Sequence, residues 1–174
     1  MTISLYDASV PVFRRYLDRL VGLVDVAESQ APALGLDEAT LLGTRLAEDM
    51  LPFETQVVIA ANFALRGSFP LAGQAVPPYG DFPTSFDGLR ARIAHAVALL
   101  DTLEPSRFAD MEMQIIESQA GRALVALPAA EFLFHYALPN FFFHITMVYA
   151  LLRQRGFAIG KEDFDGWHSY APEP

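Results

Sequence analysis

The chain has 174 residues, of which 52% are hydrophobic and 19% are charged, and it contains no cysteine. This length suits one domain, which we expect over residues 1–174, because a chain of this size buries roughly 70% of its unfolded surface without a disulfide or metal to hold it together. The absence of cysteine excludes disulfide frameworks, thiolate zinc sites, iron–sulfur clusters and cysteine nucleophiles.

Basic residues are few, since 12 Lys+Arg stand against 21 Asp+Glu and give a formal net charge of −9. A net-acidic surface repels phosphate backbones, so no nucleic-acid partner is expected. The longest apolar stretch, Tyr136–Leu152, contains a proline, an asparagine and a histidine, and a membrane span needs about 20 cleaner residues. The N-terminal segment also lacks the pattern of a secretory signal. The sequence therefore predicts a soluble, cytoplasmic protein with no membrane partner.

Four segments show the apolar spacing of helices. The first covers residues 6–28. The second begins at Asp37, a favoured N-cap residue, and continues to Ala64. Pro52 interrupts the pattern of this second segment, so we expect a kink or a break close to Asp49.

The segment that joins the second and third helices, residues 67–83, contains four prolines and three glycines without helical period. At about 3.3 Å per residue it is long enough to travel back along a helix, which leaves the second and third helices parallel. The third helix is expected to begin after an N-cap at Thr84 or Ser85 and to extend to Leu100.

A small β-hairpin is predicted ahead of the last helix. Two β-prone runs, residues 114–118 and 123–127, flank a glycine-containing turn. A two-stranded hairpin is marginal by itself, so it must lie against the helices. The fourth helical region runs from residue 129 to about residue 155 with an interruption at Pro139, and residues 157–174 are expected to form an irregular tail.

The fourth helix is apolar nearly all round between Phe141 and Leu152, which is typical of a helix that is buried on several sides. Seven of the 14 phenylalanines lie between Phe132 and Phe164. In a small bundle such a helix is either central or meets a second subunit with one face.

Three segments of the chain, taken together, resemble one known family. They are SLYDASVPVFRRYLDRL, RLAEDMLPFETQVVIAANFA and ALPNFFFHITMVYALLRQRGFAIGKEDF. They resemble the domain-of-unknown-function family 1993, which belongs with the DinB-like (YfiT-like) four-helix-bundle proteins, and the resemblance covers nearly the whole chain. It implies an all-α, DinB-like four-helix bundle with a long crossover between helices two and three, a small hairpin before helix four, and a homodimer. The biochemical role of the family is not established.

The same resemblance points to a position for a metal. DinB-like relatives hold a divalent metal with one histidine on helix two and two on helix four in an H-x-x-x-H pattern, and some of them are thiol-dependent transferases or isomerases. His144, with Arg153 nine residues later in a leucine-arginine-x-x-glycine ending, fits the second helix-four histidine. Asn140 then stands at the first position. Helix two has no histidine, and Asp49 and Gln56 are its polar residues that could face the same space.

Asn140 and His144 lie one turn apart on one helix face, so they predict either a polar site or a buried histidine that is hydrogen-bonded to Asn140 or to helix two. In the first interpretation the metal candidates are His144, Asn140 and Asp49, and the pocket includes Gln56, Met147 and Arg153. The second interpretation is favoured because asparagine is a weak ligand and stable zinc sites use three or four strong ones. Asp49 is more simply an N-cap for the helix that restarts around Pro52.

Two functions are consistent with these residues. The first is a homodimeric ligand-binding or non-catalytic protein with a small-molecule ligand, no cofactor, and a degenerate metal site at Asn140 and His144. The second is a metal-dependent enzyme, such as a thiol-dependent transferase, that holds zinc, nickel or iron through His144 with Asp49 and Asn140 or Gln56. The absence of two of the three histidines of the relatives favours the first function.

Overall fold

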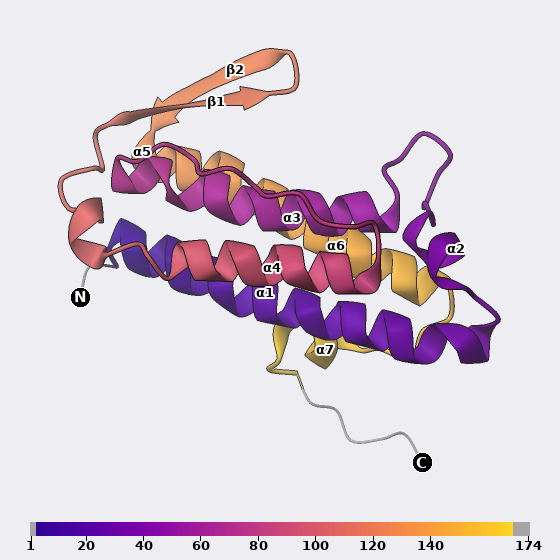
Figure 1. The fold of residues 1–174 in the computed structure, drawn as a ribbon. Helices are drawn as coiled ribbons and strands as arrows, with labels where there is room; N and C mark the ends of the chain where they lie inside the picture. The colour runs from indigo at the N-terminus through magenta and orange to yellow at the C-terminus, as the bar shows by residue number, and fades with distance from the viewer. Residues whose placement is uncertain (1–2, 169–174) are drawn as a thin grey trace.

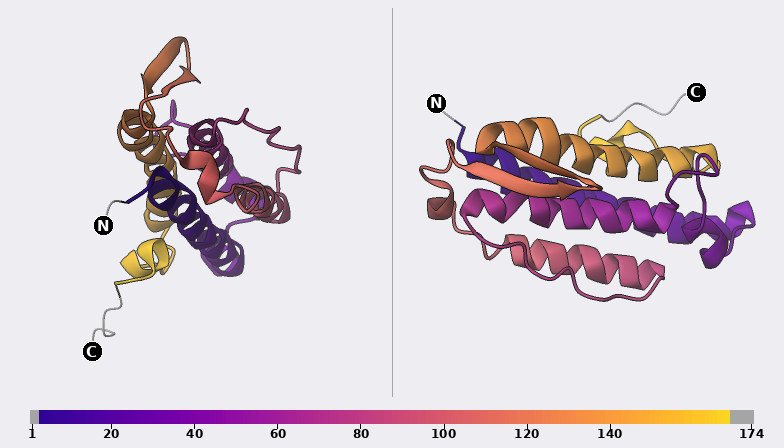
Figure 2. Two further views of the ribbon diagram at one scale, coloured as in Figure 1. Left: turned by 90° about the vertical axis from the view of Figure 1, so that its left-hand side faces the viewer. Right: turned by 90° about the horizontal axis from the view of Figure 1, so that it is seen from above.

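The protein, for which we analyse a computed structural model, is described over residues 3–168 and is mostly helical, with one small antiparallel sheet (Figure 1). Four long helices lie side by side in the cyclic order α1, α4, α3, α6 (Figure 2). The α-helices are α1 (Leu5–Gln30), α2 (Glu38–Leu42), α3 (Phe53–Ser68), α4 (Phe86–Leu100), α5 (Ala129–Glu131), α6 (Leu138–Gln154) and α7 (Lys161–Asp165). The strands are β1 (Ile115–Ala120) and β2 (Ala123–Pro128), and short 3₁₀ turns occupy Ala31–Leu34, Pro70–Ala72 and Pro105–Phe108. Within the described range no helix is both long and apolar enough to cross a membrane.

The second predicted helix is two helices. Asp37 caps α2 as expected, because its carboxylate accepts a hydrogen bond from the amide of Thr40 at 2.8 Å. The chain then forms a loop over residues 43–52 before α3, so the predicted break near Pro52 is confirmed as a loop and not as a kink. The prediction that Asp49 caps α3 is wrong. Pro52 itself occupies the N-cap position, where its fixed φ and missing N–H do no harm, and Asp49 lies exposed in the loop.

The crossover between α3 and α4 runs back along the helices, so α3 and α4 are parallel, as predicted from its length (Figures 1 and 2). Ser85 is the N-cap of α4 and accepts a hydrogen bond from the amide of Gly88 at 3.0 Å. The crossover approaches this first turn so closely that a Cβ atom at Gly88 would lie 1.9 Å from the carbonyl oxygen of Pro83. A glycine is therefore required where the crossover enters α4.

The predicted hairpin is confirmed, with β1 and β2 paired in the register Ile116↔Leu127 and Ala120↔Ala123. It lies along the outer side of the helices near the end of α3 (Figures 1 and 2). Arg66 of α3 fastens it, because the Nη2 group donates hydrogen bonds to the Ser118 hydroxyl and the Gln119 carbonyl at 2.9 and 2.6 Å. The hairpin thus has the support from the helices that a two-stranded sheet needs.

The predicted interruption at Pro139 takes the form of a wide turn. Phe132–Ala137 is π-helical and joins α5 to α6 without a gap. Proline cannot donate a backbone hydrogen bond and its ring crowds the preceding turn, and a π turn is one way to accommodate it. The side-chain amide of Asn140 donates to the Tyr136 carbonyl at 2.7 Å and satisfies an acceptor in this distorted region.

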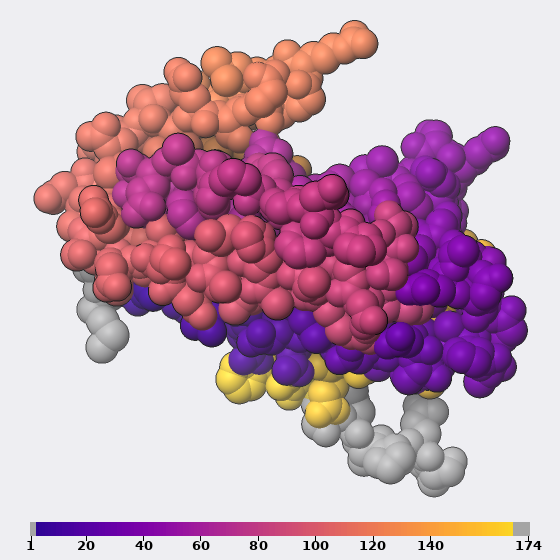
Figure 3. All heavy atoms as spheres, viewed as in Figure 1, coloured from indigo at the N-terminus to yellow at the C-terminus, as the bar shows by residue number. Residues whose placement is uncertain are grey.

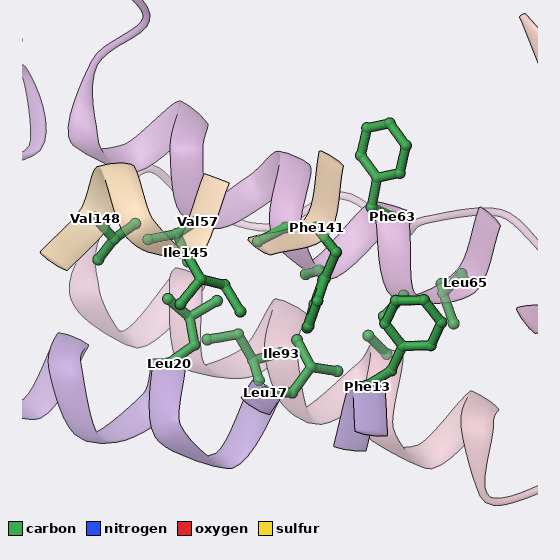
Figure 4. Packing of buried hydrophobic residues seen from close by; sticks show 14 of the residues in the cluster. Phe13, Leu17, Leu20, Val57, Phe63, Leu65, Ile93, Phe141, Ile145 and Val148 are labelled. Atoms are coloured by element: carbon green, nitrogen blue, oxygen red, sulfur yellow. The ribbon is translucent and has the colours of Figure 1, made fainter. Parts of the chain in front are cut away.

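The core lies between the four long helices, where Leu17, Leu20, Ile93, Ile145 and Val148 face one another (Figure 4). α6 contributes one inward stripe, and Phe141 of this stripe packs edge-on against Phe13 of α1 at 4.8 Å between ring centroids. The outer face of α6 is not covered, since Phe143 is 51% exposed. One face of α6 therefore lies in the core, and another face is exposed to solvent.

The prediction of an irregular tail over residues 157–174 is wrong for its first part. α7 forms within it and packs against α1 (Figure 3), while residues 169–174 lie outside the described range. Arg15 donates to the Asp165 carbonyl at 2.7 Å and stacks on the ring of Trp167 at 4.2 Å. A five-residue helix is too short to show a helical period in the sequence, so the sequence did not predict α7.

Candidate functional site

Two buried polar side chains, Gln56 and His144, meet where α3 packs against α6, and we call this contact between the two helices the α3–α6 seam. Gln56 faces α6 from the first turns of α3 and is 2% exposed, and His144 faces α3 and is 8% exposed. The Nδ1 atom of His144 lies 2.7 Å from the Oε1 atom of Gln56. Because α3 and α6 are antiparallel and packed along their lengths, two residues that are 88 positions apart meet here.

The hydrogen-bond chain defines the protonation of the imidazole. The Nε2 group of Gln56 donates to the carbonyl of Leu51 at 3.1 Å, which turns its Oε1 acceptor towards His144. The Nδ1 atom of His144 must then carry the proton, and in the neutral ring Nε2 keeps its lone pair. The Nε2 atom has no hydrogen-bond partner among the described residues.

The imidazole is neutral at physiological pH. Burial lowers the pKa of His144 to about 4, because a charged ring would lose its hydration among apolar neighbours. The ring of Phe63 stacks against it at 5.9 Å between centroids, and Phe143 packs edge-on at 5.2 Å. The ring therefore offers a hydrogen-bond acceptor over the whole physiological range, but it is a poor proton donor there.

The residues at this place do not fit a resident divalent metal. Asn140 is one turn from His144, as predicted; its amide nitrogen donates to the Tyr136 carbonyl, and its oxygen is a weak, neutral ligand. Asp49, the second predicted ligand, is exposed in the loop before α3. Over residues 3–168 no group of three or more histidine, aspartate or glutamate side chains gathers closely enough to hold a metal ion. One imidazole with two carboxamides is a weak donor set for zinc or iron.

The other two predicted pocket residues have different positions. Met147 is one turn beyond His144 on α6 and is half-buried. Arg153 lies nine residues beyond His144, about 14 Å along the helix axis, so the two side chains are not brought together. Its Nη1 group donates to the carbonyls of Phe157 and Ile159 at 3.3 and 3.0 Å, which closes the end of α6 and orients the segment that leads to α7.

Three residues that the sequence did not single out extend the site along the seam. Phe63 of α3 lies apart from the other labelled side chains in Figure 4 but is only 6% exposed, and its ring lies against both His144 and Tyr136. The guanidinium of Arg66 sits over the same ring at 4.6 Å, and its Nη2 group donates to the Tyr136 hydroxyl at 3.0 Å. The spacing of Gln56, Phe63 and Arg66, which places them on one face of α3, is the only signal that could have grouped them.

The fold places the chain among the DinB-like helical proteins. Residues 5–165 match the family described as Domain of unknown function (DUF1993), and the chain belongs to this family. It is also similar to a solved DinB family member protein from Shewanella denitrificans, with 35% sequence identity, a TM-score of 0.85, and 97% of this chain and 96% of that chain covered. No curated protein matches the chain. The resemblance to the DinB-like superfamily is thereby confirmed.

Proposed function

We propose that this protein is a cytoplasmic, homodimeric, non-catalytic member of the DinB-like superfamily that binds a small molecule at the α3–α6 seam, where a metal site of its relatives has become a neutral histidine–glutamine pair. The single observation that carries the proposal is the 2.7 Å contact between His144 and Gln56. A glutamine whose oxygen accepts from imidazole and whose nitrogen donates to a carbonyl has both ends occupied, and neither end is available to a metal.

The pair has a definite recognition chemistry. The Nε2 lone pair of His144 accepts a hydrogen bond, and its position beside Phe63 and Phe143 favours a ligand with an apolar body and one hydroxyl or amide N–H. Because the pKa of His144 is about 4, this acceptor does not switch off as the pH falls through 6. The alternative, a metal-dependent thiol transferase, needs further strong ligands beside His144, and the described residues do not supply such a cluster.

The experiment is a zinc titration of protein purified without a polyhistidine tag, followed through the imidazole ¹⁵N signals of His144. We expect the neutral tautomer with the proton on Nδ1, unchanged by EDTA and by one equivalent of zinc. His95→Gln, which changes another imidazole and leaves the seam intact, should give the same His144 signals. Stoichiometric zinc, nickel or iron in the purified protein that is lost in His144→Ala would overturn the proposal in favour of the metal enzyme.

The homodimer part of the proposal is supported by uncovered apolar surface near the start of α6. Phe134 is 52% exposed and Phe143 51%. Phe134 also lines a groove of 470 Å³, together with Leu5 of α1 and Leu138. Light scattering after size exclusion should give twice the 19.2 kDa of one chain, and Phe134→Glu should give a monomer. Leu124→Glu, the same change at an exposed leucine of β2, is the matched control and should remain dimeric. A wild-type monomer at micromolar concentration would remove the dimer.

A further inference from the structure

A recess lies near Arg66 at the far end of α3, ten residues further along this helix than Gln56, or about 15 Å. It has a volume of 490 Å³ and lies between the last turn of α3, the crossover and the hairpin. Arg66, Val76, Tyr79, Glu117 and Ser118 are among its lining residues. The space-filling view shows the hairpin projecting beyond the helices with a hollow beneath it (Figure 3).

Arg66 brings a positive charge to this recess without a direct ion pair among the described residues, although the carboxylate of Glu117 lines the same recess. Over residues 3–168 the guanidinium forms no ion pair with a carboxylate, although the chain carries a net charge of −9. All three of its hydrogen bonds use the Nη2 atom, and their acceptors are two hydroxyls and one carbonyl. The Nε and Nη1 groups have no acceptor among the described residues and are not fully buried. An arginine held in place by one nitrogen, with its other donors open, is suited to bind an anion.

Tyr79 of the crossover adds a neutral donor. Its hydroxyl has no hydrogen-bond partner among the described residues and is not fully buried. Tyr79 and Arg66 both line the recess. Burial raises the pKa of the Tyr79 phenol, and the positive charge of Arg66 opposes this shift. The O–H group therefore stays protonated at neutral pH and is available to an acceptor in the recess.

We propose that this recess binds the carboxylate of a small organic anion, with Arg66 and Tyr79 as the donors and with Pro70 and Val76 against the apolar part of the ligand. This inference deepens the proposed ligand-binding function by naming a ligand class. The inference rests on the proposed ligand-binding function, but the anion site itself uses neither His144 nor Gln56. Glu117 at the rim opposes the anion and keeps the affinity for a simple carboxylate weak.

The experiment uses benzoate as the probe and benzamide, its neutral analogue, as the control, in titrations of ¹⁵N-labelled full-length protein. Benzoate should shift the Nε–H signal of Arg66 and the amide signals of Ser118 and Gln119, with millimolar affinity, and benzamide should not. Arg66→Gln should weaken benzoate binding at least about tenfold, as expected for the loss of a charge-assisted hydrogen bond. Arg122→Gln at the hairpin turn makes the same change in net charge and should leave the affinity within about twofold.

Two further variants separate binding from the role of Arg66 in holding the hairpin. Tyr79→Phe keeps every hydrogen bond of Arg66 and should weaken benzoate binding about two- to fivefold through the lost O–H donor. Glu117→Gln should strengthen it by about twofold or more because a like charge is removed. Equal shifts from benzamide, or an unchanged benzoate affinity in both Arg66→Gln and Tyr79→Phe, would overturn the inference.

The two proposals fail in different ways. If zinc binds stoichiometrically through His144 while benzoate still binds at Arg66, the proposed function is wrong and the anion site stands. If benzoate does not bind while the His144 tautomer is insensitive to zinc, only the ligand class is wrong. Where benzoate binds, His144→Ala should leave its affinity unchanged, because the recess does not include this residue.

Discussion

Replacement of Gln56 by leucine tests the polar pair directly. The substitution keeps the side-chain volume but removes the acceptor for the Nδ1–H group of His144, which is 8% exposed. A buried donor without a partner costs about 1–3 kcal/mol, and the additional apolar surface of leucine returns about 1 kcal/mol. The Leu51 carbonyl loses its partner at little cost, since Leu51 is 44% exposed and water can replace the amide. We expect a net loss of about 1 kcal/mol, and at most about 2 kcal/mol, in the free energy of unfolding, measured by urea denaturation with circular dichroism.

The double variant Gln56→Leu/His144→Phe sharpens this test. With both polar partners replaced by apolar side chains no buried group is left unsatisfied, so the double variant should be nearly as stable as wild type and the coupling should be about 1–2 kcal/mol. Gln154→Leu, an exposed position on the same pair of helices, should change stability by less than about 0.5 kcal/mol. If Gln56→Leu were as stable as wild type, or if the effects of the two substitutions were additive, the hydrogen bond between Gln56 and His144 would not stabilise the protein.

Three further outcomes are expected. Between pH 6.5 and 4 the unfolded chain is protonated at His144 but the folded protein is not, because its His144 pKa is about 4. The free energy of unfolding should therefore decrease as the pH falls through this range. His144→Phe should show a shallower pH dependence in urea titrations. Gly88→Ala should destabilise the protein by about 2 kcal/mol or more in thermal unfolding, because its Cβ meets a backbone carbonyl, whereas Gly22→Ala in the open interior of α1 should stabilise it by about 0.5–1 kcal/mol. Arg15→Ala should accelerate hydrogen exchange in α7, and Arg14→Ala, whose ion pair is on a different surface, should not; equal exchange in both variants would refute the proposed docking of α7.

Local signals were enough to predict the four long helices, the parallel pair and the hairpin, but not the loop between α2 and α3 or the short helix α7. Asp37 and Ser85 are capping residues beside apolar periods, and the length of the crossover by itself permits α3 and α4 to run the same way. Pro52 and Pro139 each predict an interruption, but a sequence does not say whether the chain leaves the helix, as before α3, or widens it, as before α6. That choice depends on what the adjacent residues pack against.

The polar pair was predictable only through the resemblance to DinB-like proteins. That resemblance implied that His144 and a polar residue of the second predicted helix, Asp49 or Gln56, face one space, and Gln56 does so. Asp49 does not, because the break before α3 removes it from the helix whose face it was assigned to. Arg66 was missed since an arginine in the last turn of a helix is commonly explained by the helix dipole, and its partners lie on a hairpin more than 50 positions away.

The wide turn ahead of Pro139 also sets where the hairpin lies around the helical bundle. Ala129, Leu133, Ala137, Phe141 and Ile145 are spaced by four and are all fully buried. In a regular helix the first and last of them would be about 160° apart, nearly on opposite sides. The extra residue of the π turn takes back about 100° and keeps both on the core side. Deletion of one residue in this turn would rotate everything before it by that angle, and would carry the hairpin, which is joined directly to α5, away from its position over Arg66.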